Sequence, residues 1–146
     1  MISISSPAFG VIFNCNFITA SIFNIGSVYA CDVTSFSDLT NQNLTNVTGT
    51  HQSGKSNLDV KAVYASNARN LTFVPEEIHK IFPNFLILSF DFLNIETLSG
   101  NELNEYVHLE LFEIYGTYLT RIPGNLFKFT PKMHSVWLQS NKIKHI

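Results

Sequence analysis

The sequence has few charged residues, no basic patch and no long apolar segment. Charged residues make up 14% of its 146 residues, and all nine Lys and Arg lie at or after Lys55. Nucleic-acid interfaces need clustered Lys and Arg, so we expect no nucleic-acid partner. The longest apolar runs, such as residues 11–13 and 85–88, are far shorter than the roughly 18 to 20 residues that cross a bilayer. A membrane-spanning receptor is therefore excluded for the chain as it stands.

The short motifs of catalytic, cofactor and metal sites are missing as well. There is no Gly-x-Ser-x-Gly, no phosphate-binding loop, no Gly-x-Gly-x-x-Gly and no His-Glu-x-x-His. The carboxylate pairs, Glu76 with Glu77 and Glu110 with Glu113, are typical of solvated surface charges. We therefore expect no enzyme activity, no cofactor and no metal site. The histidines, which do not stand at metal-ligand spacing, are His51, His79, His108, His134 and His145.

Apolar residues are plentiful, and two cysteines lie near the N-terminus. Hydrophobic residues make up 45% of the chain, including 13 Phe, which suffices for one core and leaves little room for two full domains. Cys15 and Cys31 each lie in a segment of alternating apolar and polar residues, 11–17 and 27–33. These segments predict a β-hairpin closed by a disulfide. Such a bond would stabilise the fold by about 3 kcal/mol. Two unrelated buried thiols are the alternative.

A competing interpretation treats residues 1–30 as a signal peptide. It fits less well, because no Lys or Arg precedes the apolar stretch and Asn14, Asn16 and Asn24 interrupt it. If the hairpin is present, Cys15 belongs to the mature domain and we expect any export signal to lie upstream of this chain.

Asn-x-Ser/Thr sequons begin at Asn43, Asn46 and Asn70. Together with a disulfide they favour an extracellular, secreted glycoprotein. The alternative is that these asparagines only form turns.

A 24-residue period runs through the C-terminal part of the chain. Aligning Phe85, Leu109 and Met133 brings the later apolar residues into columns, and two pairs of prolines lie 48 residues apart. The apolar spacing does not fit one helix face, but it fits coils that each contain a short strand and bury one another's inward side chains. The columns are Leu88, Phe112 and Val136; Phe90, Ile114 and Leu138; Ile95, Leu119 and Ile143; and Leu98, Ile122 and Ile146.

These columns resemble the extracellular leucine-rich repeat family, in the 24-residue type of Toll-like receptor ectodomains and secreted insect proteins. The resemblance covers residues 60–146, most closely 109–127 and 136–146. It implies an α/β-type repeat solenoid, a horseshoe fragment with short parallel strands on its concave face, preceded by an N-terminal β-hairpin. It also implies a binding module without catalytic activity. Asn141 keeps the asparagine usual in the family, whereas Leu93 and Thr117 replace it.

This resemblance predicts two parts. Residues 1–59 form a Cys-bearing hairpin or cap and a glycosylatable linker, and residues 60–146 form about four repeats without a C-terminal cap. The repeat frame also predicts which side chains point outward from the strands. They are aromatic, apolar and acidic, as in a protein-binding hot spot with a negative rim. The predicted partner-binding residues are Tyr64, Ile87, Asp91, Phe92, Glu110, Leu111, Glu113, Tyr115 and Trp137.

The expected function is non-catalytic binding of an extracellular protein ligand or receptor through this face. Aromatic side chains at such positions also pack on neighbouring strands, and Trp137 could instead cover missing repeats. Two further alternatives stay open: a structural, self-associating matrix-type protein that pairs through the end near Ile146, and a truncated fragment of a longer receptor.

Overall fold

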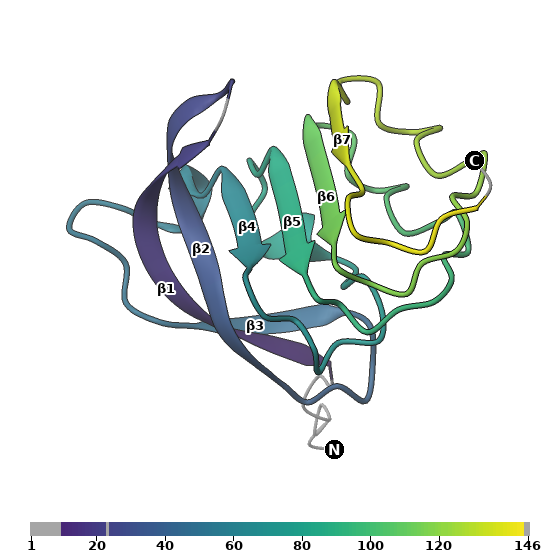
Figure 1. Ribbon diagram of the computed structural model, residues 1–146. Helices are drawn as coiled ribbons and strands as arrows, with labels where there is room; N and C mark the ends of the chain where they lie inside the picture. The colour runs from purple at the N-terminus through teal and green to yellow at the C-terminus, as the bar shows by residue number, and fades with distance from the viewer. Residues whose placement is uncertain (1–9, 23, 145–146) are drawn as a thin grey trace, which may run out of the picture.

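The strands of this chain join into one open, mixed sheet with very little helix (Figure 1). The computed structural model describes residues 10–22 and 24–144. Across the sheet the strands lie in the order β3-β1-β2-β4-β5-β6-β7. The elements are β1 (Val11–Ile22), β2 (Gly26–Ser37), β3 (Leu44–Thr48), the 3-10 helix η1 (Asn57–Asp59), β4 (Ala62–Ala65), α1 (Ile78–Ile81), β5 (Ile87–Asp91), β6 (Leu111–Tyr115) and β7 (Ser135–Trp137).

The N-terminal hairpin and its disulfide are confirmed. β1 and β2 pair antiparallel along their length, with a bulge between Asn14 and Cys15. The disulfide joins Cys15 to Cys31, whose Cα atoms are 5.1 Å apart, and both residues are buried. Because a register slip would turn every side chain to the other face, this covalent bond fixes which face of the hairpin is buried.

β4 to β7 are short parallel strands, and the pairing of β5, β6 and β7 follows the 24-residue period, whereas β4 pairs with β5 at an offset of 25 residues. Leu88 of β5 lies opposite Phe112 of β6, and Phe112 lies opposite Val136 of β7. Leu88 and Phe112 are fully buried, while Val136 is exposed on the last strand of the sheet. The first column of the sequence alignment therefore corresponds to neighbouring positions in adjacent strands.

The predicted fold class, an α/β-type leucine-rich repeat solenoid or horseshoe fragment, is wrong. The structure is a small mixed sheet of seven strands that is neither closed nor solenoid-like. A spacing of 24 residues determines which residues pair in neighbouring strands, but it does not determine how the sheet continues beyond them. Here β2 pairs in parallel with β4, so the antiparallel hairpin continues the same sheet. The only α-helix of the described residues, α1, has four residues.

One core joins the hairpin to the parallel strands. Phe13 of β1 packs edge-on against Phe36 of β2 and Phe90 of β5, with ring centroids 5.5 and 6.5 Å away. Phe17 packs edge-on against Phe82, at 6.3 Å. Burying a large apolar side chain stabilises the fold by roughly 1.5 to 3 kcal/mol. The predicted N-terminal and C-terminal parts therefore share a single apolar interior.

Asn141 satisfies backbone groups in the turn after β6. Its side-chain amide donates hydrogen bonds to the carbonyl oxygens of Ile114 and Leu138, at 2.9 and 2.8 Å. Its side-chain oxygen accepts from the backbone N–H of Thr117 at 3.0 Å. These bonds tie the chain after β7 to the turn of the preceding strand.

No helix in residues 10–22 and 24–144 is long and apolar enough to cross a membrane. Ile146, the predicted self-association residue, lies outside the described residues. Residues 10–22 and 24–30, part of the alternative signal segment, form β1, the turn and the start of β2.

Removing the disulfide should lower the free energy of unfolding by about 3 kcal/mol, because the bond closes a short loop in the unfolded chain. The test compares wild type with the Cys15→Ala/Cys31→Ala variant in urea unfolding followed by circular dichroism. A reductant should shift the wild-type transition to the position of the variant and leave the variant unchanged. A wild-type unfolding transition that does not shift in the reductant would contradict the presence of the disulfide.

Candidate functional site

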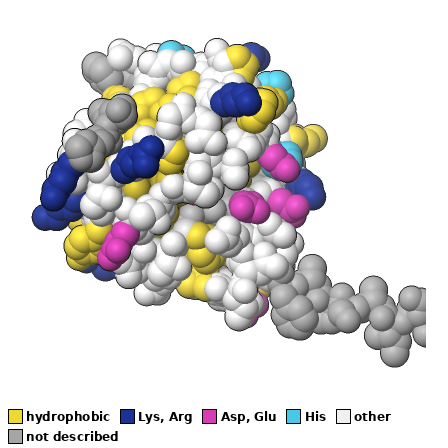
Figure 2. All heavy atoms as spheres, turned by 90° about the vertical axis from the view of Figure 1, so that its right-hand side faces the viewer, with side chains coloured by type: hydrophobic (Ala, Val, Ile, Leu, Met, Phe, Trp, Pro, Cys, Tyr) yellow, Lys and Arg dark blue, Asp and Glu magenta, His cyan; other side chains and the backbone are white. Residues whose placement is uncertain are grey.

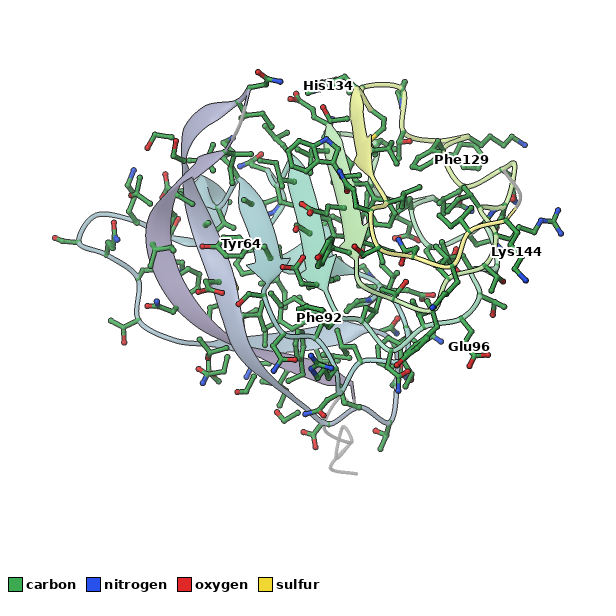
Figure 3. All side chains as sticks on the ribbon, viewed as in Figure 1. Tyr64, Phe92, Glu96, Phe129, His134 and Lys144 are labelled. Atoms are coloured by element: carbon green, nitrogen blue, oxygen red, sulfur yellow. A yellow bond between two sulfur atoms is a disulfide. The ribbon has the colours of Figure 1, made fainter. Side chains whose placement is uncertain are left out.

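A row of polar and aromatic side chains crosses five strands on the face of the sheet opposite the main core. Asp32 of β2 lies opposite Tyr64 of β4, and Tyr64 lies opposite Ser89 of β5. Ser89 lies opposite Glu113 of β6, which lies opposite Trp137 of β7. Alternate side chains of a strand share a face, so the parallel register brings these five residues into line. Figure 3 shows Tyr64 near the middle of the sheet.

A second, smaller apolar cluster lies beside this row. Its buried members are Ala30, Ala62, Ile87 and Leu111, at the same level of four neighbouring strands. The partly buried side chains that pack against it include Ala20, Ile22, Ile25 and Val28, all from the hairpin. The connecting end of the hairpin therefore folds over this face of the sheet and shields it from water.

A groove of about 350 Å³ lies between the hairpin end and the parallel strands. Ile87 and Leu111 are its most buried lining residues, and Ala20, Ser21 and Ile22 form the hairpin side. The remaining lining residues come from the polar and aromatic row: Tyr64, Ser89, Glu113 and Trp137. Ligand sites commonly combine an apolar lining with a few polar groups, and this groove lies at the lower end of their usual size. It can admit side chains of an extended segment.

Five of the nine predicted partner-binding residues line this groove. They are Tyr64, Ile87, Leu111, Glu113 and Trp137. Ile87 and Leu111, expected to point outward, lie on the predicted face but are only 1% and 3% exposed, because the hairpin covers them.

The other four predicted residues lie outside the groove lining. Phe92 packs edge-on against Tyr115, with ring centroids 5.6 Å apart, and the Arg69 guanidinium lies 4.7 Å from the centre of the Phe92 ring. Asp91 precedes Phe92 at the end of β5. Glu110 lies before β6, where its Oε2 is 3.4 Å from Nε2 of His134. In Figure 3, Phe92 and His134 lie at opposite ends of the parallel strands.

No direct signal in the sequence indicates the hairpin side of the groove. Ala20, Ser21 and Ile22 line it, and Asp32 extends the polar row beyond Tyr64. The apolar residues of the hairpin end were an indirect signal, since a hairpin that projects into water has no need of them. The pattern of apolar residues does not determine which surface they cover.

Three carboxyl groups on this face are partly desolvated. Burial raises the pKa of Asp32, Asp91 and Glu113 above the usual value. At Glu113, the Ser89 hydroxyl donates to Oε2 at 3.1 Å and opposes the effect of burial, while the negative charge of Asp91 adds to it. Burial and the charge of Asp32 also raise the pKa of Tyr64. In the described part of the chain, the carboxylates within 4 Å of a Lys, Arg or His nitrogen are Glu77, beside Lys80, and Glu105 and Glu110, each beside a histidine.

The groove combines a few polar groups with aromatic and aliphatic side chains. Among residues 10–22 and 24–144, no three His, Cys, Asp or Glu residues are grouped to hold a metal ion. The Ser89 hydroxyl and the Glu113 carboxylate form the polar pair in the groove, beside aromatic and aliphatic side chains. Such a site offers one anionic acceptor and apolar surface to a bound group.

Comparisons of the chain with protein family models, with curated proteins and with solved structures find no match. The resemblance to leucine-rich repeat proteins therefore stays a prediction from the sequence motifs.

The sequon asparagines differ in exposure: Asn46 and Asn70 are exposed, whereas Asn43 is partly buried.

Replacing Glu113 by Gln should reduce the loss of stability as the pH rises. A carboxyl group whose pKa is raised by folding binds protons more tightly in the folded state, so its ionisation destabilises the fold as the pH climbs above the usual pKa of 4.5. Urea unfolding midpoints are measured for wild type and Glu113→Gln between about pH 4 and pH 7. As the pH rises, the midpoint of the variant should increase relative to that of wild type.

Glu96→Gln is the matched control, because Glu96 is exposed and lies far from Tyr64 in Figure 3. The difference in unfolding midpoint between Glu96→Gln and wild type should not increase with pH. A difference in midpoint between Glu113→Gln and wild type that stays constant with pH would contradict the desolvation of Glu113.

Proposed function

We propose that this chain is a non-catalytic extracellular binding module, and that a segment of a protein partner binds in the groove beneath the hairpin end. The groove itself carries the proposal. Its lining joins a hairpin and four parallel strands, so residues far apart in the sequence converge on one depression. Tyr64 and Trp137, which lie on the outer strands of the lining, belong to the residue types that dominate the binding energy of protein interfaces.

The size and lining of the groove favour a protein segment over a larger rigid ligand. The volume of about 350 Å³ suits one or two side chains. The polar row continues past the groove to Asp32, so an extended segment could make further contacts along it.

Extracellular localisation is part of the same proposal. The disulfide is weakly consistent with an oxidising compartment, where such bonds persist. The exposed sequon asparagines, Asn46 and Asn70, are accessible to a glycosyltransferase.

Self-association is the second candidate function, and the free edge of β7 favours it. Val136 and Phe129 are 39% and 45% exposed, and β7 is the last strand of the sheet. Figure 2, which views the side of the molecule that carries the C-terminal loops, shows apolar patches with Lys and Arg among them. Residues after Glu113 include five Lys and Arg and no Asp or Glu. Symmetric pairing of two such edges would bring like charges together, so we rank this candidate second.

Truncating the aromatic groove residues should weaken peptide binding by about tenfold or more, since hot-spot residues contribute at least about 1.4 kcal/mol each. The peptides are selected from a random display library on the wild-type protein. Their affinities are then measured by calorimetry for Tyr64→Ala, for Trp137→Ala and for the control Tyr118→Ala, whose side chain is exposed on a loop.

Selected peptides should lose affinity for the first two variants and keep it for Tyr118→Ala. Thermal unfolding of each variant checks that the fold is intact. A selection that yields no peptide sensitive to Tyr64 or Trp137 would contradict binding in the groove.

Expression through a eukaryotic secretory pathway should give a glycosylated product. Enzymatic removal of N-linked sugar should lower its intact mass, and Asn46→Gln/Asn70→Gln should remove most of that difference because these amides are the exposed ones. Asn125→Gln, an exposed asparagine outside any sequon, is the control. Secreted protein of unmodified mass would argue against the glycoprotein assignment.

A further inference from the structure

The acidic group of the groove has no cation beside it in the described part of the chain. Glu113 is partly buried, and the Ser89 hydroxyl hydrogen-bonds to its Oε2. Among residues 10–22 and 24–144, the carboxylates within 4 Å of a Lys, Arg or His nitrogen are other ones. All nine Lys and Arg of the sequence belong to these described residues, so the chain itself brings none to Glu113.

A ligand that occupies the groove would remove still more water from Glu113. An apolar ligand would leave this carboxylate desolvated without a partner, and an acidic ligand would add repulsion from Glu113, Asp32 and Asp91. A cationic group would replace the lost water with a charge-assisted hydrogen bond. Charge complementarity therefore selects a cationic occupant.

The neighbours of Glu113 favour arginine among the cationic side chains. Trp137 lies next to Glu113 across the strand pair, and Tyr64 lies two strands away on the other side. A planar guanidinium stacks on aromatic rings and binds a carboxylate through two parallel N–H groups, which an ammonium cannot do. The aliphatic part of the side chain would lie against Ala20 and Ile22, the partly exposed apolar residues of the groove lining.

The chain contains a guanidinium–aromatic contact at another position. At the end of β5 the Arg69 guanidinium lies over the ring of Phe92. An arginine from outside would repeat this contact in the groove.

We propose that the groove binds an arginine side chain on an extended segment of the partner, with its guanidinium on the Glu113 carboxylate and against Trp137. This inference rests on the proposed function and names the chemistry of its ligand.

Trp137 is the only tryptophan of the chain, so its fluorescence reports occupancy of the groove. The probe is the capped peptide acetyl-Ser-Val-Arg-Val-Ser-amide, and the matched peptide carries citrulline, which has the shape of arginine without its charge. The arginine peptide should change the emission in a saturable way and bind about tenfold more tightly than the citrulline peptide. A lysine peptide should fall between the two.

Glu113→Gln should abolish the preference for arginine over citrulline, and Glu96→Gln should preserve it. Circular dichroism shows whether each variant is folded, and the titrations are repeated over a range of protein concentrations to detect occupancy by a second copy. Equal affinity for the two peptides, absence of binding by the arginine peptide, or a preference that survives Glu113→Gln would each overturn the inference. So would an emission change that depends on protein concentration alone.

These failures are distinguishable from failure of the proposed function. If peptides from the random library lose affinity for Tyr64→Ala and Trp137→Ala but contain no arginine, the groove binds a partner and the arginine assignment is wrong. If no selected peptide depends on Tyr64 or Trp137, both proposals fail.

Discussion

The parallel pairing of β2 with β4 is the interaction on which the rest of the structure depends. It places Ala30 opposite Ala62, Cys31 opposite Val63 and Asp32 opposite Tyr64, and so joins an antiparallel hairpin to a set of parallel strands. The small, fully buried side chains of Ala30 and Ala62 leave room above them for the hairpin end. Because the disulfide fixes the register of the hairpin, the position of β2 also determines where β1 and the connecting turn lie. The second apolar cluster and the groove beside it follow from this arrangement.

The two faces of the sheet have different roles because the strands alternate. One face holds the phenylalanine-rich core, which spans β1, β2 and the parallel strands. The other face combines apolar residues under the hairpin with carboxyl groups whose pKa values are raised by burial. Desolvated carboxylates cost stability, and Glu113, the one that lines the groove, is the acceptor in the proposed binding of a cationic group. The same residues thus link the energetics of the fold to the proposed recognition.

The sequence predicted the features that depend on local or periodic patterns. Cys15 and Cys31 indicated the hairpin and its bridge, and the 24-residue spacing placed Leu88, Phe112 and Val136 side by side. The same spacing did not predict the architecture, because it carries no information about the strands joined to β4. The solenoid prediction was therefore wrong. The repeat frame predicted Tyr64, Glu113 and Trp137 on one face, and the strand register aligns them across the sheet. The hairpin side of the groove could not be predicted, because the contact of Ile22 with that face joins segments far apart in the sequence.

Methyl nuclear Overhauser effects in solution test the central claim most directly. The account predicts cross-peaks from Ile22 and Ala20 of the hairpin end to Ile87 and Leu111 of the parallel strands, since all four line the same groove. Cross-peaks between Leu88 and the Phe112 ring serve as an internal reference for the paired strands. If the reference cross-peaks are present and those to Ile22 and Ala20 are absent, the hairpin does not cover this face and the groove does not exist.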